Sequence, residues 1–201
     1  MAIRPSVNVT YTGISECVAD VSRWFLENGL LLNPTKTEAV LFGTRAQHEK
    51  MPTACGLNIT GAVVPFHDPV KLLGVTLDSS LTMDRHVAGV LRSCNYHMCA
   101  LCHISPLLTH DAAKMIAHSV VLSRLDYANA LLYGMTTTNL NKLQVVQNTL
   151  ARVVCRAPRS VSATELRRQR HWLQIHQRIT YKIAVITYRP ELPALLLTSL
   201  T

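Results

Sequence analysis

The sequence predicts an α+β protein in which one helix and short antiparallel strands precede a mainly α-helical bundle. Three observations lead to this fold class. Apolar residues fill 48% of the 201 positions and charged residues only 16%, which is typical of a chain that buries a core. Short runs of β-type residues crowd residues 57–78. From residue 82 onward, apolar residues recur at helical spacing.

Residues 1–81 alternate helix, loop and strand signals. A helix is expected over 15–28, with Gly29 as its stop. Its apolar side chains lie at helical spacing: Ile14, Val18, Val21 and Phe25. Residues 37–43 (TEAVLFG) predict a buried strand, and residues 44–55 predict a polar loop. Three further β-type runs, divided by Gly61 and Pro69, are expected at 57–60, 62–66 and 70–78.

Residues 82–160 predict three amphipathic helices in an antiparallel bundle, because their connections are short. The first ends at Pro106, and its apolar stripe is Val87, Leu91, Cys94, Met98 and Leu101. Thr109 is the expected N-cap of the second and Gly134 its end, with a stripe of Met115, Ile116, Val120, Tyr127 and Leu131. Thr138 is the expected cap of the third, whose inward residues are Leu140, Leu143, Gln147, Leu150 and Val154.

Residues 161–201 predict a basic segment with a helical stretch over about 163–189. The chain has a net charge of +8, and residues 152–201 carry nine basic and two acidic side chains. Such a block favours a polyanionic partner, above all nucleic acid; the alternative is a solvated, arginine-rich helix face. The candidate nucleic-acid-binding cations are Arg152, Arg156, Arg159, Arg167, Arg168, Arg170, Arg178 and Lys182.

Two details bear on this basic block. Arg152, Arg156 and Arg159 follow one another at steps of four and three, so a helix continuing that far would place them on one face. The rings of Trp172 and Tyr181 could stack on bases, or they could belong to the core.

Catalytic and metal-binding patterns are weak. No Gly-rich phosphate loop or G-x-S-x-G elbow occurs, and no two carboxylates adjoin. Cys99-Ala-Leu-Cys102-His103 has the spacing of haem attachment, but buried thiols at a helix interface are the preferred explanation. No metal site is therefore expected. Without a secretory or membrane-spanning apolar run, we expect an intracellular chain, nuclear or cytoplasmic, that is not secreted and has no membrane partner.

Four runs in order resemble the C-terminal part of a non-LTR (LINE-type) retrotransposon reverse transcriptase, an RNA-directed DNA polymerase. They are DVSRWFLENGLLLNPTKTEAVLFGTR, VKLLGVTLDSSLTMDRHV, SVVLSRLDYANALLYGM and LNKLQVVQNTLARVV. The resemblance implies that residues 1–81 are the end of the palm with a primer-grip-like hairpin. It likewise implies that residues 82–160 are a three-helix thumb and that residues 161–201 are the basic segment after it.

The resemblance also implies roles for single residues. Leu73 and Gly74 would lie in the hairpin that grips the 3′ end of the primer. The alternative for Gly74 is a simple bulge within a strand. Lys36 takes the place of a family lysine near the departing pyrophosphate, where an ammonium could donate a proton or neutralise charge as an auxiliary group. The alternative is that Lys36 lies in a turn and contacts solvent.

The chain departs from the family in ways that limit the expected activity. The aromatic–X–Asp–Asp motif is missing, so we expect a truncated, catalytically incomplete fragment that retains surfaces for RNA or RNA/DNA duplex. Mg²⁺ is expected only for the complete polymerase, and this chain needs no cofactor. Gln174 stands where the family has proline, which puts the local turn in doubt.

The alternative function is a helical protein-interaction module that binds the missing palm and fingers, or another protein, through exposed apolar residues including 192–200.

Overall fold

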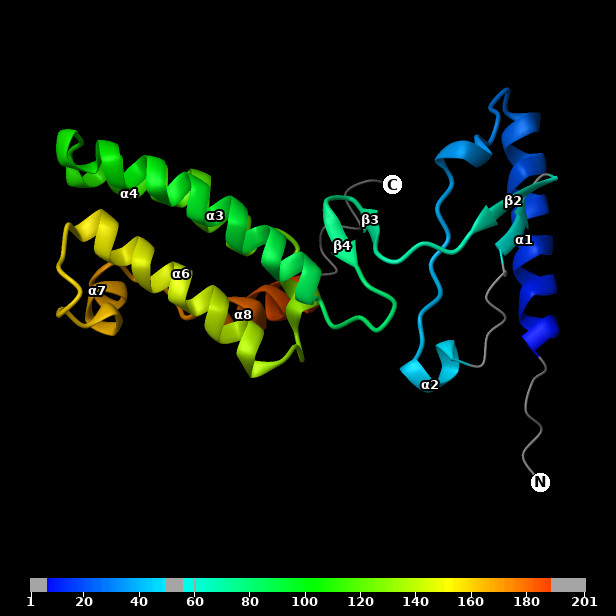
Figure 1. Cartoon of the computed structure of the whole chain (residues 1–201). Coiled ribbons are helices and arrows are strands. Elements are labelled where there is room, and N and C mark those ends of the chain that lie inside the picture. Colours follow the sequence, from blue (N-terminus) through cyan, green and yellow to red (C-terminus); the bar gives the residue numbers. More distant parts are fainter. Residues whose placement is uncertain (1–6, 50–55, 60, 189–201) are drawn as a thin grey trace, which may run out of the picture. The chain divides into compact units, whose positions relative to one another are not determined.

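The structure, a computed structural model, describes residues 7–49, 56–59 and 61–188 (Figure 1). The chain divides into two compact units, residues 1–82 and 83–201. The first contains a long helix and two antiparallel two-stranded sheets, and the second is helical. The predicted α+β class, with a small strand region before a helical bundle, is confirmed.

Helix α1 (Val7–Glu27) ends where the sequence predicts, at a glycine. Gly29 has a φ of +72°, and its N–H donates to the Leu26 carbonyl at 3.1 Å. The next N–H, of Leu30, donates to the Phe25 carbonyl at 2.8 Å. These two bonds form a Schellman motif, in which glycine adopts the left-handed conformation without strain. The helix begins earlier than predicted, because β-branched residues near its start weaken the local helix signal.

A small apolar core joins α1 to the first hairpin. Strand β1 (Gly56–Ile59) pairs antiparallel with β2 (Ala62–Pro65), and Leu57 lies opposite Val64. The buried residues of this core are Ala39, Ile59 and Val64, with Val18, Leu32, Leu57 and Phe66 packed against them. Much of the apolar surface of α1 is not covered: Trp24 is 57% exposed and Leu26 61%.

The predicted strand over 37–43 is wrong. Only Ala39 makes a β-bridge, parallel to Phe66, and its carbonyl accepts from the His67 N–H at 2.7 Å. A strand needs a partner for the backbone groups along its length. The described residues of this unit supply backbone partners at Ala39 and at Gly43, whose N–H donates to the Ser79 carbonyl at 3.0 Å, and these two points do not form a ladder. One helical turn, α2 (Arg45–His48), interrupts the expected loop.

A second hairpin replaces the single strand predicted over 70–78. Strand β3 (Val70–Leu72) pairs antiparallel with β4 (Val75–Leu77). The two turn residues both have positive φ, +47° at Leu73 and +82° at Gly74. This is the backbone of a type I′ turn, whose twist suits a tight hairpin. Gly74 therefore lies in the turn between the strands and not within one strand.

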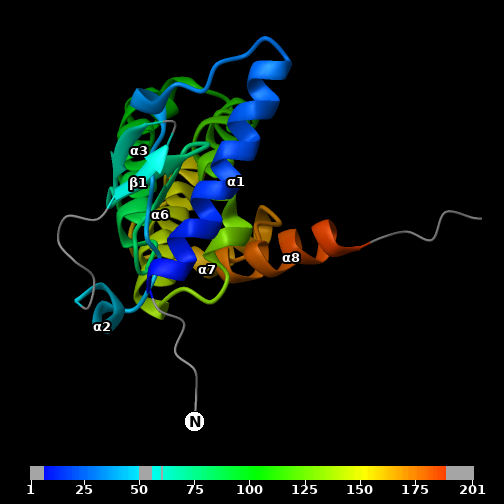
Figure 2. The same cartoon turned by 90° about the vertical axis from the view of Figure 1, so that its right-hand side faces the viewer.

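The helical unit begins with the three helical segments that the sequence predicts. The first is α3 (Asp84–Ile104), followed by a short 3₁₀ turn, η2 (Ser105–Leu107). The second runs without interruption through α4 (His110–Ile116), a π-helical segment η3 (Ala117–Leu122) and α5 (Ser123–Asp126). The third, α6 (Thr137–Cys155), packs beside α3 (Figures 1 and 2).

The buried face of the second helix differs from the predicted stripe. Its N-cap is Thr109, as predicted, and the Thr109 Oγ1 accepts from the Ala112 N–H at 3.2 Å. Met115, Tyr127 and Leu131 are exposed, whereas the buried residues are Ala113, Ala117, Val121, Leu122 and Leu125. Small alanines allow close approach of a neighbouring helix, and a pattern based on large apolar residues overlooks them. The helix also ends at Asp126, before the predicted Gly134.

The third helix buries the face that the sequence predicts, and the first does so at its principal positions. Along α6, four of the predicted residues are buried, namely Leu143, Gln147, Leu150 and Val154. Along α3, Val87, Cys94 and Leu101 are buried. The N-cap of α6 is Thr136 rather than Thr138, and the Thr136 Oγ1 accepts from the Asn139 N–H at 3.4 Å.

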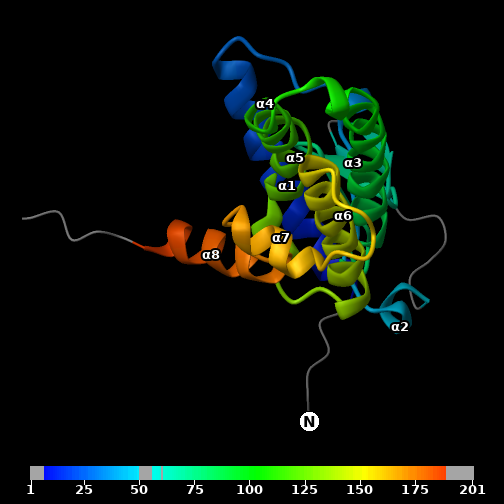
Figure 3. The same ribbon diagram turned by 90° about the vertical axis from the view of Figure 1, so that its left-hand side faces the viewer.

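The predicted helical stretch over 163–189 is broken into two helices, α7 (Ala163–Gln169) and α8 (Ile175–Thr187). Both pack on α6 (Figure 3). The chain turns at His171, whose φ is +56°, and the Trp172 N–H donates to the Arg167 carbonyl at 2.9 Å. Trp172 is buried, so its ring belongs to the core.

Candidate nucleic-acid interface

The predicted site residues of the first unit lie on its surface. Lys36 ends a short 3₁₀ turn, η1 (Pro34–Lys36), and its side chain is exposed. The side chain of Asn33 shapes this turn, because its Oδ1 accepts from both the N–H and the Oγ1 of Thr35, at 3.0 and 2.7 Å. Leu73, at the tip of the β3–β4 hairpin, is 82% exposed. A left-handed leucine held in solvent is unusual, and it presents an apolar hairpin tip.

Three arginines that the sequence groups together line one cavity, although the helix does not continue as far as Arg159. Helix α6 ends at Cys155, and Arg156 takes a left-handed conformation with φ of +51°. Arg159 therefore lies in the turn that follows the helix. The cavity has a volume of about 510 Å³, and its lining is Cys102, Thr149, Arg152, Val153, Arg156, Ala157 and Arg159.

The three guanidinium groups in this cavity differ in what they bind. Arg156 Nη2 donates to the Ser105 carbonyl at 2.5 Å and also to the Leu108 carbonyl. Arg156 thus satisfies carbonyls at the end of α3 and η2, a structural role. Arg152 is half-buried, and its Nε is buried with no hydrogen-bond partner among the described residues. Arg159 is exposed.

Two cations on α7 have contrasting surroundings. Arg167 is only 5% exposed, and its Nη2 donates to the Thr164 hydroxyl at 3.2 Å. Burial lowers the pKa of the Arg167 guanidinium, because desolvation disfavours its charged form. Arg168 is exposed and forms an ion pair with Glu165 at 3.2 Å. Arg167 therefore lies in the interior of the helical unit, and its Nε, like that of Arg152, is buried with no hydrogen-bond partner among the described residues.

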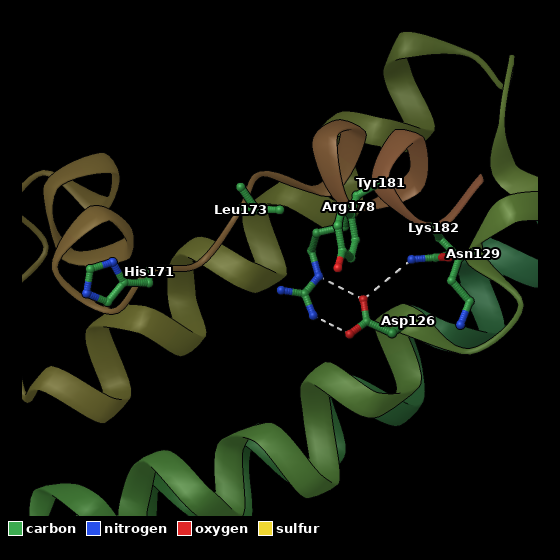
Figure 4. Close-up of a pocket in the computed structure, with 7 residues that line it drawn as sticks. All are labelled: Asp126, Asn129, His171, Leu173, Arg178, Tyr181 and Lys182. Carbon is green, nitrogen blue, oxygen red and sulfur yellow. Dashed lines mark hydrogen bonds and ion pairs between the residues drawn. The ribbon is translucent and has the colours of Figure 1, made fainter. Parts of the chain in front are cut away.

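Helix α8 carries two predicted cations with different partners. Arg178 forms a two-pronged ion pair with Asp126 of α5, in which Nε lies 2.7 Å from Oδ1 and Nη2 contacts Oδ2 (Figure 4). The side chain of Arg178 is only 15% exposed. Lys182, one turn further along, is exposed. Arg170, between the two helices, is half-buried.

Two glutamine amides of α6, one buried and one half-buried, hold this region together. Gln147 is fully buried, and its Nε2 donates to the Leu173 carbonyl at 2.8 Å. Gln144 accepts from the Ile175 N–H at 3.0 Å and so binds the first residue of α8. One indication of this role is present in the sequence, namely that Gln147 stands among the apolar residues of the predicted inward face. These bonds fix the segment that places Arg178 and Lys182 on the bundle.

Gln174 resolves the doubt about the turn before α8. It is the N-cap residue, with φ of −62° and ψ of 156°. Its N–H donates to the Gln177 Oε1 at 3.1 Å. The glutamine thus adopts a φ that proline would also adopt, because the helix cap holds it there.

Cysteine and carboxylate positions bear on metal binding. Cys94 is buried, but Cys99 and Cys102 are exposed, so the prediction that they fill a helix interface is wrong for these two. Among the described residues, no three His, Cys, Asp or Glu side chains gather as a metal site would require.

Within the same ranges, no helix is long and apolar enough to span a membrane. Cys55 and the apolar residues 192–200 lie outside the described residues.

The chain is similar to two curated RNA-directed DNA polymerases of Drosophila melanogaster mobile elements. It is 25% identical over 183 residues to a probable RNA-directed DNA polymerase from transposon BS, covering 86% of this chain and 19% of that protein. It is 23% identical over 159 residues to the RNA-directed DNA polymerase from mobile element jockey, covering 76% of this chain and 16% of that protein. The chain thus spans less than a fifth of either relative. No protein-family model matches it, and no solved structure matches significantly.

Proposed function

We propose that this chain is a part of a mobile-element reverse transcriptase and that its helical unit holds the template–primer duplex. In this proposal residues 1–81 are the end of the palm, residues 82–160 the thumb and residues 161–201 the basic segment that follows. The similarity to two RNA-directed DNA polymerases over most of the chain supports the assignment. The partner is RNA or an RNA/DNA duplex.

The arginine cavity beside α6 is the observation that carries the proposal. Arg152 and Arg159 enter one open cavity, and the buried Nε of Arg152 has no acceptor among the described residues. A phosphate oxygen would supply that acceptor, and the planar guanidinium group can bind it in a two-pronged manner. Because Arg156 and Arg178 serve internal contacts and Arg167 is buried, we assign duplex phosphate binding chiefly to Arg152, Arg159, Arg168 and Arg170.

The salt dependence of duplex binding tests this assignment. On duplex DNA each phosphate contact contributes about 0.9 to the slope of log K against log salt. The double substitution Arg152→Gln with Arg159→Gln should therefore flatten the slope by about 1.8. The control pair Arg23→Gln with Arg45→Gln removes two exposed, ion-paired arginines of the first unit and should leave the slope unchanged. A slope that the cavity variant does not alter would refute the assignment.

In the first unit, the β3–β4 hairpin is the proposed primer contact. Its tip presents Leu73, which is exposed, and Gly74, which has no side chain between its backbone and an approaching strand. Lys36 is the proposed auxiliary group near the pyrophosphate, because its ammonium is exposed on the η1 turn. These roles rest on the family resemblance and on exposure.

We propose that the chain by itself does not polymerise nucleotides. Two-metal phosphoryl transfer needs clustered carboxylates, and the sequence has no adjoining pair. The described residues do not fit a Mg²⁺ site, because no cluster of potential ligands occurs among them. Primer extension on an RNA template with Mg²⁺ should show no incorporation. Sustained incorporation at ordinary enzyme concentrations would contradict this.

Exposed apolar side chains support a protein-binding role as the second candidate. On α1 and in the segment after it the exposed set is Ile14, Val21, Trp24, Leu26, Leu30 and Leu31. Such a surface favours a protein partner, either the rest of the polymerase or another protein. Size-exclusion chromatography with light scattering separates the candidates: a monomer that binds duplex supports the first, and a stable oligomer indifferent to nucleic acid supports the second.

A further inference from the structure

We propose that a cavity beside α8 binds one unpaired nucleotide of a single strand. The cavity lies among α5, the 3₁₀ turn η4 (Asn129–Leu132), the turn before α8 and α8 itself (Figure 4). Its volume is about 300 Å³, and its lining is Asp126, Asn129, His171, Leu173, Arg178, Tyr181 and Lys182. This inference rests on the proposed nucleic-acid function. It concerns a second cavity, and its ligand is a single strand rather than a duplex.

An unsatisfied amide points to a ligand. Asn129 is only 3% exposed, and its Nδ2 donates to the Asp126 Oδ1 at 3.4 Å. Its Oδ1 is buried and accepts no hydrogen bond from any described residue. Buried acceptors without a donor are rare because they cost free energy. A ligand that carries an N–H or O–H donor would satisfy Asn129.

The electrostatic surroundings favour a ligand with a phosphate. Among the described residues of the lining, Asp126 is the one carboxylate, and Arg178 forms an ion pair with it. Lys182 is exposed, and it lines the same cavity as Asn129 (Figure 4). Because the lysine stem is flexible, the ammonium group can reach the phosphate of a ligand in this cavity.

An aromatic ring provides a surface for a base. Tyr181 is 63% exposed, and it lines the cavity together with Leu173, which is 45% exposed. Bases of single strands stack on such rings with little sequence preference. An aromatic ring, a hydrogen-bond acceptor and a cation in one cavity match the base and the phosphate of a nucleotide. In a duplex the base faces are stacked within the helix, so an unpaired nucleotide is the ligand that fits.

Fluorescence anisotropy with the full chain tests the proposal on labelled single-stranded and duplex RNA of equal length. Tyr181→Leu should weaken single-strand binding about fivefold or more, because a stacking contact is lost. Lys182→Gln should weaken it and lower its salt slope by about 0.7. The matched control Tyr188→Leu changes a tyrosine that is 73% exposed beyond the end of α8 and outside the cavity, and it should have no effect.

The duplex and a free nucleotide serve as comparison ligands. Tyr181→Leu should leave duplex binding within about twofold of the unchanged chain, whereas Arg152→Gln with Arg159→Gln should weaken it. Adenosine 5′-monophosphate should compete with the single strand only in large excess. An unchanged single-strand affinity in Tyr181→Leu would overturn the nucleotide cavity but not the duplex assignment. Equal affinities for the free nucleotide and the strand would also overturn it, since the ligand would then be a free nucleotide.

Discussion

Arg178 and Asp126 lie 52 positions apart in the sequence, and their side chains form a two-pronged ion pair. The pair joins α8 to the end of α5. Both side chains are largely shielded from solvent, with exposed fractions of 15% and 35%. The sequence predicts that Arg178 is available to bind nucleic acid, whereas in the structure it forms an ion pair that links two helices of the bundle.

Removing this ion pair should destabilise the helical unit. Asp126→Asn leaves Arg178 without its counter-charge, and we expect a loss of about 2 kcal/mol in the free energy of unfolding, the size of a hydrogen bond to a charged group. Urea denaturation followed by circular dichroism measures it. Arg168→Gln breaks only an exposed ion pair and should cost less than about 0.5 kcal/mol. Equal effects of the two substitutions would contradict the structural role of Arg178.

Arg156 should be more important for stability than Arg159. Arg156→Lys keeps the charge but loses the donation from Nη2 to the carbonyls of Ser105 and Leu108. We expect this substitution to lower the free energy of unfolding by about 1–3 kcal/mol, the cost of leaving such acceptors unpaired. Arg159→Lys, at an exposed position, should change it by less than about 0.5 kcal/mol. The reverse order in thermal unfolding would show that Arg156 does not hold the end of α3.

Cys94 should make stability depend on pH in the alkaline range. Burial raises the pKa of its thiol from 9.0 to about 11, partly offset by the charge of Arg124. Because the folded-state pKa is the higher one, the stabilisation is complete below pH 9 and is lost as pH rises toward 11. Unfolding free energies measured at pH 8 and pH 10 should therefore differ more for the unchanged chain than for Cys94→Ala. A pH dependence that Cys94→Ala leaves unaltered would rule out this thiol as its source.

Gln174→Pro should be tolerated. The φ of −62° at this position matches that of proline, and the substitution removes the capping box that Gln174 forms with Gln177 at an exposed helix start. Proline also reduces the conformational freedom of the unfolded chain, which stabilises by about 0.4–1 kcal/mol. We expect a melting temperature equal to or slightly above that of the unchanged chain by differential scanning calorimetry. A loss of several degrees would show that the Gln174 N–H matters more than its exposure suggests.

Sequence alone predicted the features that depend on neighbouring residues. Gly29 as the stop of α1 and Thr109 as the cap of α4 follow from local backbone geometry, and both are confirmed. The inward face of α6 follows from helical spacing, because residues three and four apart share one side of a helix. The order of the four runs likewise indicated the similarity to RNA-directed DNA polymerases.

Only the tertiary structure decided which basic residues remain on the surface. Arg156, Arg167 and Arg178 look like Arg152 and Arg159 in the sequence, yet their partners or their burial come from other segments. Composition counts charges but does not show which carbonyl or carboxylate the fold brings to each one. The strand expected over 37–43 did not form for the same reason. A strand exists only where another segment supplies hydrogen bonds along its length, and that depends on contacts between residues distant in the sequence.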